Sequence, residues 1–158
     1  MSEDLRIEPA DRDDPDLRQL VTDHLADMVA TTPDPASRHA LDHDDLFGPA
    51  VAVWVARLDG RVAGCGALAE LTPDSGELKA MRTTVEARGH GVGTAVLRHL
   101  LDEARGRGYR AVHLETGAQD FFAPARRLYE AHGFVATGPF GTYVEDPASV
   151  FMRLDLAL

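Results

Sequence analysis

A glycine-rich run in the second half of the chain has residue types suited to binding an anion. It reads Arg88-Gly89-His90-Gly91-Val92-Gly93-Thr94 and lies between a strand-like segment and one with helical spacing. Glycines let a backbone approach a ligand closely, and the N–H groups of a helix start carry about half a unit of positive charge. No Gly-Lys-Ser/Thr follows, and the third glycine comes too early for a dinucleotide fingerprint. The run predicts an anion-binding turn; tight strand-to-helix packing is the alternative.

Two carboxylates on neighbouring predicted strands are candidates for acid–base chemistry. Glu77 begins the strand that leads into the glycine-rich turn, and Glu115 ends the next strand. The period of two along a strand places Glu77, Lys79, Met81 and Thr83 on one face. The alternative for Glu77 is a surface carboxylate that pairs with Lys79 or with solvent.

Other reactive side chains give weaker signals. Arg88 and Arg126 are candidate phosphate ligands, because guanidinium groups form charge-assisted hydrogen bonds; solvated arginines are the alternative. Cys65 lies in an apolar segment without an evident histidine partner, which favours a buried thiol over a nucleophile. His39 and His43 stand four residues apart, but no third ligand follows at a defined spacing, so no metal site is predicted.

The apolar patterns predict the elements that must position these residues. Two short helices are expected within residues 15–47, separated by the prolines of Thr31–Pro35. Further along, strands are expected at 51–57, 61–71, 77–85, 110–116 and 151–156, and helices at 91–105 and 124–132. The order α-α-β-β-β-α-β-α-β predicts an α/β fold.

Length and charge limit the function classes. The 158 residues and 44% apolar content predict one domain over residues 1–158, with no membrane segment. Residues 1–50 hold 13 of the 26 acids and only 4 arginines, so they carry −9 of the net charge of −10. This charge disfavours nucleic acid and favours cationic small molecules, although a solvated acidic surface is the alternative. An acidic start and a single cysteine predict a cytoplasmic protein.

Two motifs together resemble the GNAT superfamily of acyl-CoA-dependent N-acyltransferases. The run Arg88–Gly93 matches its signature Arg/Gln-x-x-Gly-x-Gly/Ala. The segment Ala125-Arg126-Arg127-Leu128-Tyr129-Glu130-Ala131-His132-Gly133-Phe134 is similar to its Ala-x-x-Leu-Tyr-x-x-x-Gly-Phe pattern. Residues 115–117 and 138–152 resemble a small bacterial branch with poorly assigned substrates. The resemblance implies a GNAT-like mixed central sheet flanked by helices.

The resemblance also implies how acetyl-CoA would bind as the acyl donor, without a metal. Residues 51–158 would form the sheet and the CoA-binding core, and the acidic helical residues 1–50 would lie on the acceptor side. Backbone near Met81 would contact the pantetheine arm and polarise the thioester carbonyl, where losing one donor costs about 3 to 4 kcal/mol. The expected cofactor-binding residues are Met81, Arg82, Thr83, Arg88, Gly89, His90, Gly91, Val92, Gly93, Thr94 and Arg126.

Two side chains are expected to move protons in such an enzyme. An alkyl ammonium has a pKa near 10, so the acceptor must lose a proton before it attacks. By resemblance, Glu77 is the expected base, with Glu115 or a water as alternatives. Tyr129 of the Leu-Tyr pair is the expected acid toward the departing thiolate; a packed core tyrosine is its alternative.

The sequence therefore predicts an N-acetyltransferase that acts by direct attack in a ternary complex. The N-terminal charge favours a cationic small-molecule amine as the acceptor. The alternative is a non-catalytic acyl-CoA-binding or regulatory module. A donor longer than acetyl-CoA is also open, and the resemblance implies that homodimers can form.

Overall fold

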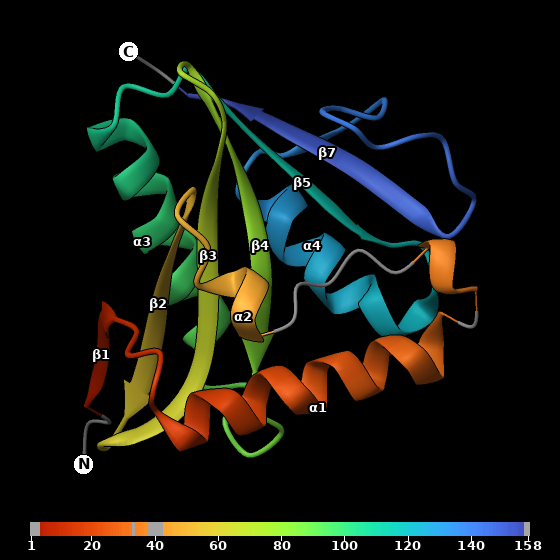
Figure 1. Ribbon diagram of the computed structural model, residues 1–158. Helices are drawn as coiled ribbons and strands as arrows, with labels where there is room; N and C mark the ends of the chain where they lie inside the picture. The colour runs from red at the N-terminus through yellow and green to blue at the C-terminus, as the bar shows by residue number, and fades with distance from the viewer. Residues whose placement is uncertain (1–3, 33, 38–42, 157–158) are drawn as a thin grey trace.

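A seven-stranded sheet organises the computed structural model, which describes residues 4–32, 34–37 and 43–156 (Figure 1). The strand order is β1-β2-β3-β4-β5-β7-β6. Only the β4–β5 pair is parallel, and the other neighbours are antiparallel. The mixed α/β class expected from the sequence is therefore confirmed. The strands are β1 (Leu5–Pro9), β2 (Val51–Leu58), β3 (Arg61–Thr72), β4 (Ser75–Thr83), β5 (Ala111–Gly117), β6 (Val135–Thr137) and β7 (Ser149–Asp155).

Helices cover both faces of this sheet. Helices α1 (Pro15–Thr31) and α2 (His43–Leu46) pack on one face, and α3 (Val92–Gly106) and α4 (Ala123–Ala131) pack on the other. Short 3₁₀ turns, η1 (Pro35–Ser37) and η2 (Asp120–Phe122), complete the described elements. None of the helices in the described ranges is long and apolar enough to cross a membrane.

Local sequence signals explain where the main helices begin and which face they bury. The Asp14 side chain accepts from the backbone N–H of Asp16 and so caps α1, and Pro15 fits the first helical turn. Helix α3 buries an apolar stripe at helical spacing: Val92, Val96, Leu97, Leu100, Leu101 and Ala104. The resulting core on this face holds α3 and α4 against the middle of the sheet.

Two strands were not anticipated, and both are short edge elements. The first 50 residues contain β1 as well as helices, so the expectation of a purely helical segment is wrong. Its five residues pair with β2 at one edge of the sheet. Strand β6 has three exposed residues and pairs with β7 at the other edge. Segments this short carry too little periodicity to be recognised, and their partners supply the pairing.

Strands β4 and β5 separate after a short paired stretch, and this separation positions the site. Their pairing runs only from Ser75 opposite Ala111 to Leu78 opposite Leu114. Beyond it the strands diverge, with α1 on one side of the opening and α4 on the other (Figure 1). The second half of β4 thus presents backbone and side chains that have no partner strand on the β5 side.

A bulge in β4 changes the direction of the side chains at the same place. Arg82 pairs with Cys65 and Lys79 with Ala67, so Ala80 and Met81 together oppose a single residue of β3. Ala80 has φ of +54°, a left-handed value that is uncommon outside glycine.

The bulge overturns the expectation that Glu77, Lys79, Met81 and Thr83 share one face. Met81 packs into the α3 core together with Leu78, whereas Lys79 lies opposite Ala67 of the α1 core. Successive side chains of β4 point to alternate faces of the sheet up to Lys79, and the extra residue of the bulge then shifts this alternation by one position.

Candidate active site

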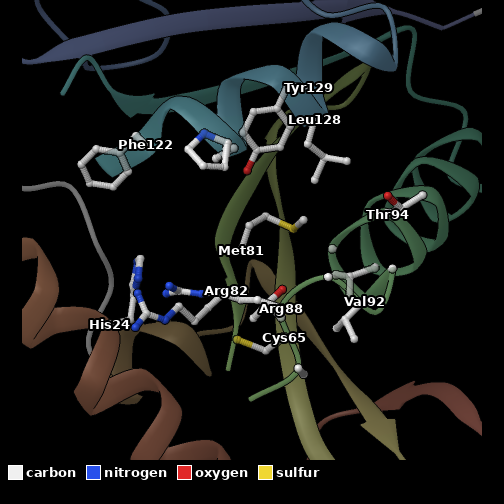
Figure 2. A pocket seen from close by; sticks show the side chains of 18 of the residues that line it. His24, Cys65, Met81, Arg82, Arg88, Val92, Thr94, Phe122, Leu128 and Tyr129 are labelled. Atoms are coloured by element: carbon white, nitrogen blue, oxygen red, sulfur yellow. The ribbon is translucent and has the colours of Figure 1, made fainter. Parts of the chain in front are cut away.

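The larger of two adjoining cavities lies between β4, the glycine-rich turn and α4. Its volume is about 460 Å³, which is within the usual range for small-molecule sites. Figure 2 shows Met81, Val92, Leu128 and Tyr129 around this space, with the Tyr129 oxygen pointing into it. The expected cofactor residues that line this cavity are Met81, Arg82, Thr83, Arg88, Gly89, Gly91, Val92, Gly93 and Thr94.

The glycine-rich turn has the backbone form of an anion-binding loop. Gly89 and Gly91 have φ of +83° and +77°, and no atom lies within 4 Å of where a Cβ would stand on either. Gly91 is the N-cap of α3, and no side chain among the described residues caps this helix start. The first N–H groups of α3 therefore remain directed at the cavity, together with the positive end of the helix dipole.

The smaller cavity fills the opening between β4 and β5. It has a volume of about 100 Å³ and contains three charged side chains, Glu77, Lys79 and Glu115. Tyr143 and Met28 also line it. The two cavities share His24, Met81, Phe122, Ala125 and Tyr129, so they meet at the opening between the strands.

Glu77 is the centre of a buried polar group in the smaller cavity. Its side chain is 8% exposed, and its Oε2 accepts from Lys79 Nζ at 3.0 Å and from Tyr143 OH at 2.6 Å. Lys79 Nζ also donates to the Tyr143 oxygen at 3.0 Å. Burial and the hydrogen bond to Glu77 raise the pKa of Tyr143 far above its ordinary value, so the phenol stays protonated.

Tyr129 and Glu115 lie near the junction of the cavities. Tyr129 is 5% exposed. Burial raises its pKa above the ordinary value, and the negative charge of Glu115 raises it further. A protonated phenol is therefore available at the junction over the whole physiological pH range. Ser149 Oγ donates to Glu115 Oε2 at 2.6 Å, which fixes that carboxyl from the adjacent strand β7.

His24 of α1 is a site residue that sequence reasoning missed. It lines both cavities, and its buried Nδ1 has no hydrogen-bond partner within the described part of the chain. Burial and the nearby Arg82 guanidinium lower its pKa to about 4, so the ring is neutral at pH 7. One signal was present: His24 takes the next place in the buried stripe of Leu17, Leu20 and Val21.

Arg82 lies on the α1 face of β4, where its guanidinium bonds Asp27 of α1. Its Nε is buried and has no partner among the described residues. Figure 2 shows the side chain entering the larger cavity near His24. The bulge gives it this direction, because the preceding Met81 points to the opposite face.

Two expected cofactor residues, His90 and Arg126, are not among the described residues that line the cavities. Arg126 Nη1 donates to the carbonyls of Gly117 and Gln119, at 2.6 and 3.0 Å, and so ties the end of β5 to α4. His90 belongs to the turn, but neither it nor Arg126 is among the described residues that line the cavities. The Arg126 side chain bonds backbone carbonyls and His90 is exposed, so neither side chain forms part of the cavity wall.

The cavities also contain an apolar wall from α4 and the turn before it. Phe122, Ala125, Leu128 and Tyr129 recur at intervals of three and four, which places them on one face of the helical segment. Cys65 of β3 lines the larger cavity; its thiol donates to the Ala80 carbonyl at 3.2 Å, and burial raises its pKa to about 12.

No group of three metal-ligating side chains occurs among residues 4–32, 34–37 and 43–156. Of the two histidines considered for a metal, His39 lies outside the described residues, and nothing is described of the His43 side chain.

Comparison with protein families gives one match over most of the chain. The model of the acetyltransferase (GNAT) family matches residues 17–134. An uncharacterized N-acetyltransferase, YsnE of Bacillus subtilis, is 47% identical over 137 residues, which cover 87% of this chain and 90% of the relative. An IAA acetyltransferase of Azospirillum brasilense is 43% identical over 121 residues, covering 76% and 78% of the two chains.

Solved structures have a similar fold. A putative acyl-CoA N-acyltransferase from Klebsiella pneumoniae has a TM-score of 0.76 at 26% identity, with 97% of this chain and 98% of that chain covered. The yncA protein of Salmonella typhimurium, a putative acetyltransferase solved with its cofactor acetyl-CoA, has a TM-score of 0.70 at 22% identity, covering 97% and 94%. The second likeness shows the fold alone.

Proposed function

The chain belongs to the acetyltransferase (GNAT) family and is an N-acetyltransferase, and we propose that it moves an acetyl group from acetyl-CoA to a cationic small-molecule amine. The observation that carries this proposal is the meeting of two cavities between the diverging strands β4 and β5. One cavity has the backbone of an anion site, and the other contains carboxylates.

The larger cavity fits a long phosphorylated acyl donor. The turn from Arg88 to Thr94 would hold its phosphates through backbone N–H groups, because Gly89 and Gly91 keep that side open. The bulge at Ala80 and Met81 leaves backbone outside the regular ladder, as a pantetheine arm and a thioester carbonyl require. When bound, acetyl-CoA supplies an activated acyl group.

Protons would be handled by Glu77 and Tyr129 on the two sides of the junction. The acceptor enters as an ammonium, and Glu77 is the buried carboxylate that takes up its proton. Tyr129 is protonated and points into the larger cavity, which suits a donor toward a departing sulfur. Glu115 lines the smaller cavity as well and remains the second candidate for the base.

The side chains of the larger cavity support direct attack by the amine in a ternary complex. Cys65 is the cysteine that lines the larger cavity, and burial raises its pKa to about 12. Burial disfavours the thiolate at neutral pH, so this thiol is a poor candidate for an acyl carrier. The amine reaches the donor through the shared section of the cavities instead.

A cationic acceptor agrees with the charges around the smaller cavity. Two carboxylates and one ammonium line it, and His24 is neutral there. Beyond the residues that line the cavity, residues 1–50 carry −9 of the net charge of −10 in the sequence. An acidic surround raises the local concentration of cations, and the effect weakens as salt shortens the Debye length to about 8 Å at 0.15 M.

The proposal is tested by calorimetric titration with acetyl-CoA and CoA, followed by a thiol-release screen against amines of different charge. We expect acetyl-CoA to bind at micromolar concentration, cationic amines to react faster than anionic ones, and salt to reduce that difference. Equal rates for both classes would contradict the cationic acceptor. Binding without thiol release from any amine would favour a non-catalytic acyl-CoA-binding module.

The Tyr129→Phe variant separates catalysis from binding. It should lower kcat about 100-fold and leave the Kd of acetyl-CoA unchanged, since the ring that lines the cavity is retained. Tyr109→Phe is the matched control, because Tyr109 donates to Glu70 on another part of the sheet and should retain wild-type kinetics. A binding module would tolerate both changes equally.

We further propose that residues 1–158 form a single domain that acts in the cytoplasm and can form a homodimer. The family match crosses residue 50, and the strand β1 from the acidic segment joins the same sheet as β2. Light scattering coupled to size exclusion tests the oligomeric state, and a monomer at high micromolar concentration would exclude the homodimer.

A further inference from the structure

Two nitrogen atoms at the wall of the larger cavity have no hydrogen-bond partner in the described part of the chain. They are Arg82 Nε of β4 and His24 Nδ1 of α1, and both atoms are buried. Figure 2 shows the two side chains beside each other, on the opposite side of this cavity from Tyr129. Buried polar atoms are normally hydrogen-bonded, so two such nitrogens at one cavity wall need an explanation. An oxygen atom of a bound ligand supplies one.

Arg82 has a donor left for such a ligand. One amino group of its guanidinium bonds the Asp27 carboxylate, and Nε makes no contact of this kind with the described residues. A guanidinium carries five N–H donors, so the bond to Asp27 does not exhaust them. The Arg82 side chain is only 10% exposed, so bulk solvent does little to satisfy its N–H groups.

His24 can donate to the same oxygen. Burial and the positive charge of Arg82 lower its pKa to about 4, so the ring is neutral at pH 7. In the tautomer with the proton on Nδ1, this nitrogen is a donor. Two neighbouring donors, one of them on a cation, suit a carboxylate best, because charge-assisted hydrogen bonds are the stronger ones. An ammonium has donors alone and would satisfy neither nitrogen.

Arg82 also faces a third cavity, which lies between α1 and the ends of β3 and β4. This cavity has a volume of about 480 Å³, and no described residue of the glycine-rich turn lines it. Arg82 lines both this cavity and the larger one, so its side chain stands between them. The other charged groups of the third cavity are three carboxylates and one guanidinium, from Asp16, Asp23, Glu86 and Arg61. The α1 side of Arg82 is therefore a place apart from the phosphate end of the donor.

We propose that Arg82 and His24 form a carboxylate subsite and that the acceptor is a basic amino acid; this inference rests on the proposed function. The carboxylate of the acceptor accepts from Arg82 Nε and His24 Nδ1, and its amine extends toward Glu77. His24 lines both the larger and the smaller cavity, so one ligand can contact it and continue into the smaller one. A basic amino acid stays cationic in spite of its carboxylate, as the acidic surroundings favour.

The test compares lysine with cadaverine, which has the same two amines on the same chain and lacks only the carboxylate. At pH 7 cadaverine carries two positive charges, and lysine carries a net charge of one. If charge alone selected the acceptor, cadaverine would react faster. The carboxylate subsite predicts the opposite order, with kcat/KM for lysine about 10- to 100-fold above that for cadaverine, as one or two hydrogen bonds to a charged group allow.

Two variants then assign this preference to the subsite. Arg82→Lys keeps a positive charge beside Asp27 and removes Nε, and His24→Phe keeps a ring in both cavities and removes both nitrogens. Each should lower the ratio of kcat/KM between lysine and cadaverine by about 10-fold, mainly through the KM of lysine. The Kd of acetyl-CoA measured by calorimetry shows whether the donor still binds.

Two controls separate recognition from a structural role. Arg105→Lys makes the same change at an exposed arginine of α3 and should retain the wild-type ratio. Asp27→Asn loosens the contact between α1 and β4 while it keeps both subsite nitrogens, so the preference for lysine should persist even where both rates fall.

The outcomes distinguish the subsite from the proposed function. A wild type that prefers cadaverine, treats both amines equally, or releases thiol only with other amines overturns the subsite while the transferase stands. A preference for lysine that survives in both Arg82→Lys and His24→Phe also overturns it, since the carboxylate would then bind elsewhere. A wild type that releases no thiol with any amine overturns the proposed function, and the subsite with it.

Discussion

Replacing Glu77 by glutamine should separate two roles of this carboxylate, one in stability and one in proton transfer. The change keeps the size of the side chain and removes its charge. Lys79, whose side chain is 15% exposed, then loses a carboxylate partner at 3.0 Å. At an effective dielectric constant of about 20, the attraction across that distance is about 5 kcal/mol. Partial access of water to Lys79 reduces the expected loss in the free energy of unfolding to about 3 kcal/mol.

An exposed ion pair of this chain provides the matched control. Asp102 and Arg105 of α3 lie 3.3 Å apart, with side chains 79% and 48% exposed. Asp102→Asn makes the same carboxylate-to-amide change and should cost less than about 0.5 kcal/mol, since solvent screens exposed pairs. Urea unfolding of both variants gives the two free energies directly.

A double variant then divides stability from activity. Combining Glu77→Gln with Lys79→Met removes both buried charges, and the free energy of unfolding should return to within about 1 kcal/mol of the wild type. Thiol release should stay about 100-fold or more below wild type in the single and the double variant, because each lacks the proposed base. A single variant as stable as Asp102→Asn, or a double variant that regains no stability, would refute the reasoning about the buried pair.

Three further measurements follow from the backbone and the buried groups. Gly91→Ala should destabilise the protein by about 1 kcal/mol, because φ is +77° there. Gly106→Ala in α3 should stabilise it by about 0.5 to 1 kcal/mol, because this residue is outside the left-handed region and has open space around it. If urea unfolding showed that both substitutions change the free energy of unfolding in the same direction, this prediction would be wrong. The pKa of His24 is lowered from 6.5 to about 4 by burial, so between these values the unfolded chain binds a proton that the native chain does not. Stability should therefore fall by up to about 3 kcal/mol as the pH drops from 6.5 to 4, and His24→Phe should flatten this part of the pH profile. Cys65, with its pKa raised to about 12, should resist iodoacetamide at pH 8 in the folded protein and react in urea; fast labelling of the native state would show that the thiol is accessible.

The geometry of the glycine-rich turn and of the α4 wall of the larger cavity was predictable, because its signals are local in sequence. A turn of three glycines between a strand and a helix sets its own backbone geometry, and the structure places φ values of +83° and +77° at Gly89 and Gly91. The Leu128-Tyr129 pair follows helical spacing, so its direction is tied to that of α4. The main helices and five of the strands follow from periodicity in the same way.

The smaller cavity depended on contacts between distant segments. Tyr143 and Glu77 are 66 residues apart, and nothing in the local pattern of either residue indicates the other. His24 reaches both cavities only because α1 packs across the opening between β4 and β5. Such contacts are fixed by how whole elements pack, which a pattern along one segment does not encode.

The sequence by itself determined the class of fold, the glycine-rich turn between strand and helix and the family, since glycine placement and apolar periodicity act over a few residues. The tertiary structure alone decided the face to which each side chain of β4 points. A bulge at Ala80, a non-glycine residue with φ of +54°, resets the alternation and sends Met81 into the core under α3 while Lys79 stays opposite Ala67 of the α1 core. That backbone conformation is unfavourable for alanine in isolation, so it exists only because the pairing with β3 and the packing on both faces hold it in place.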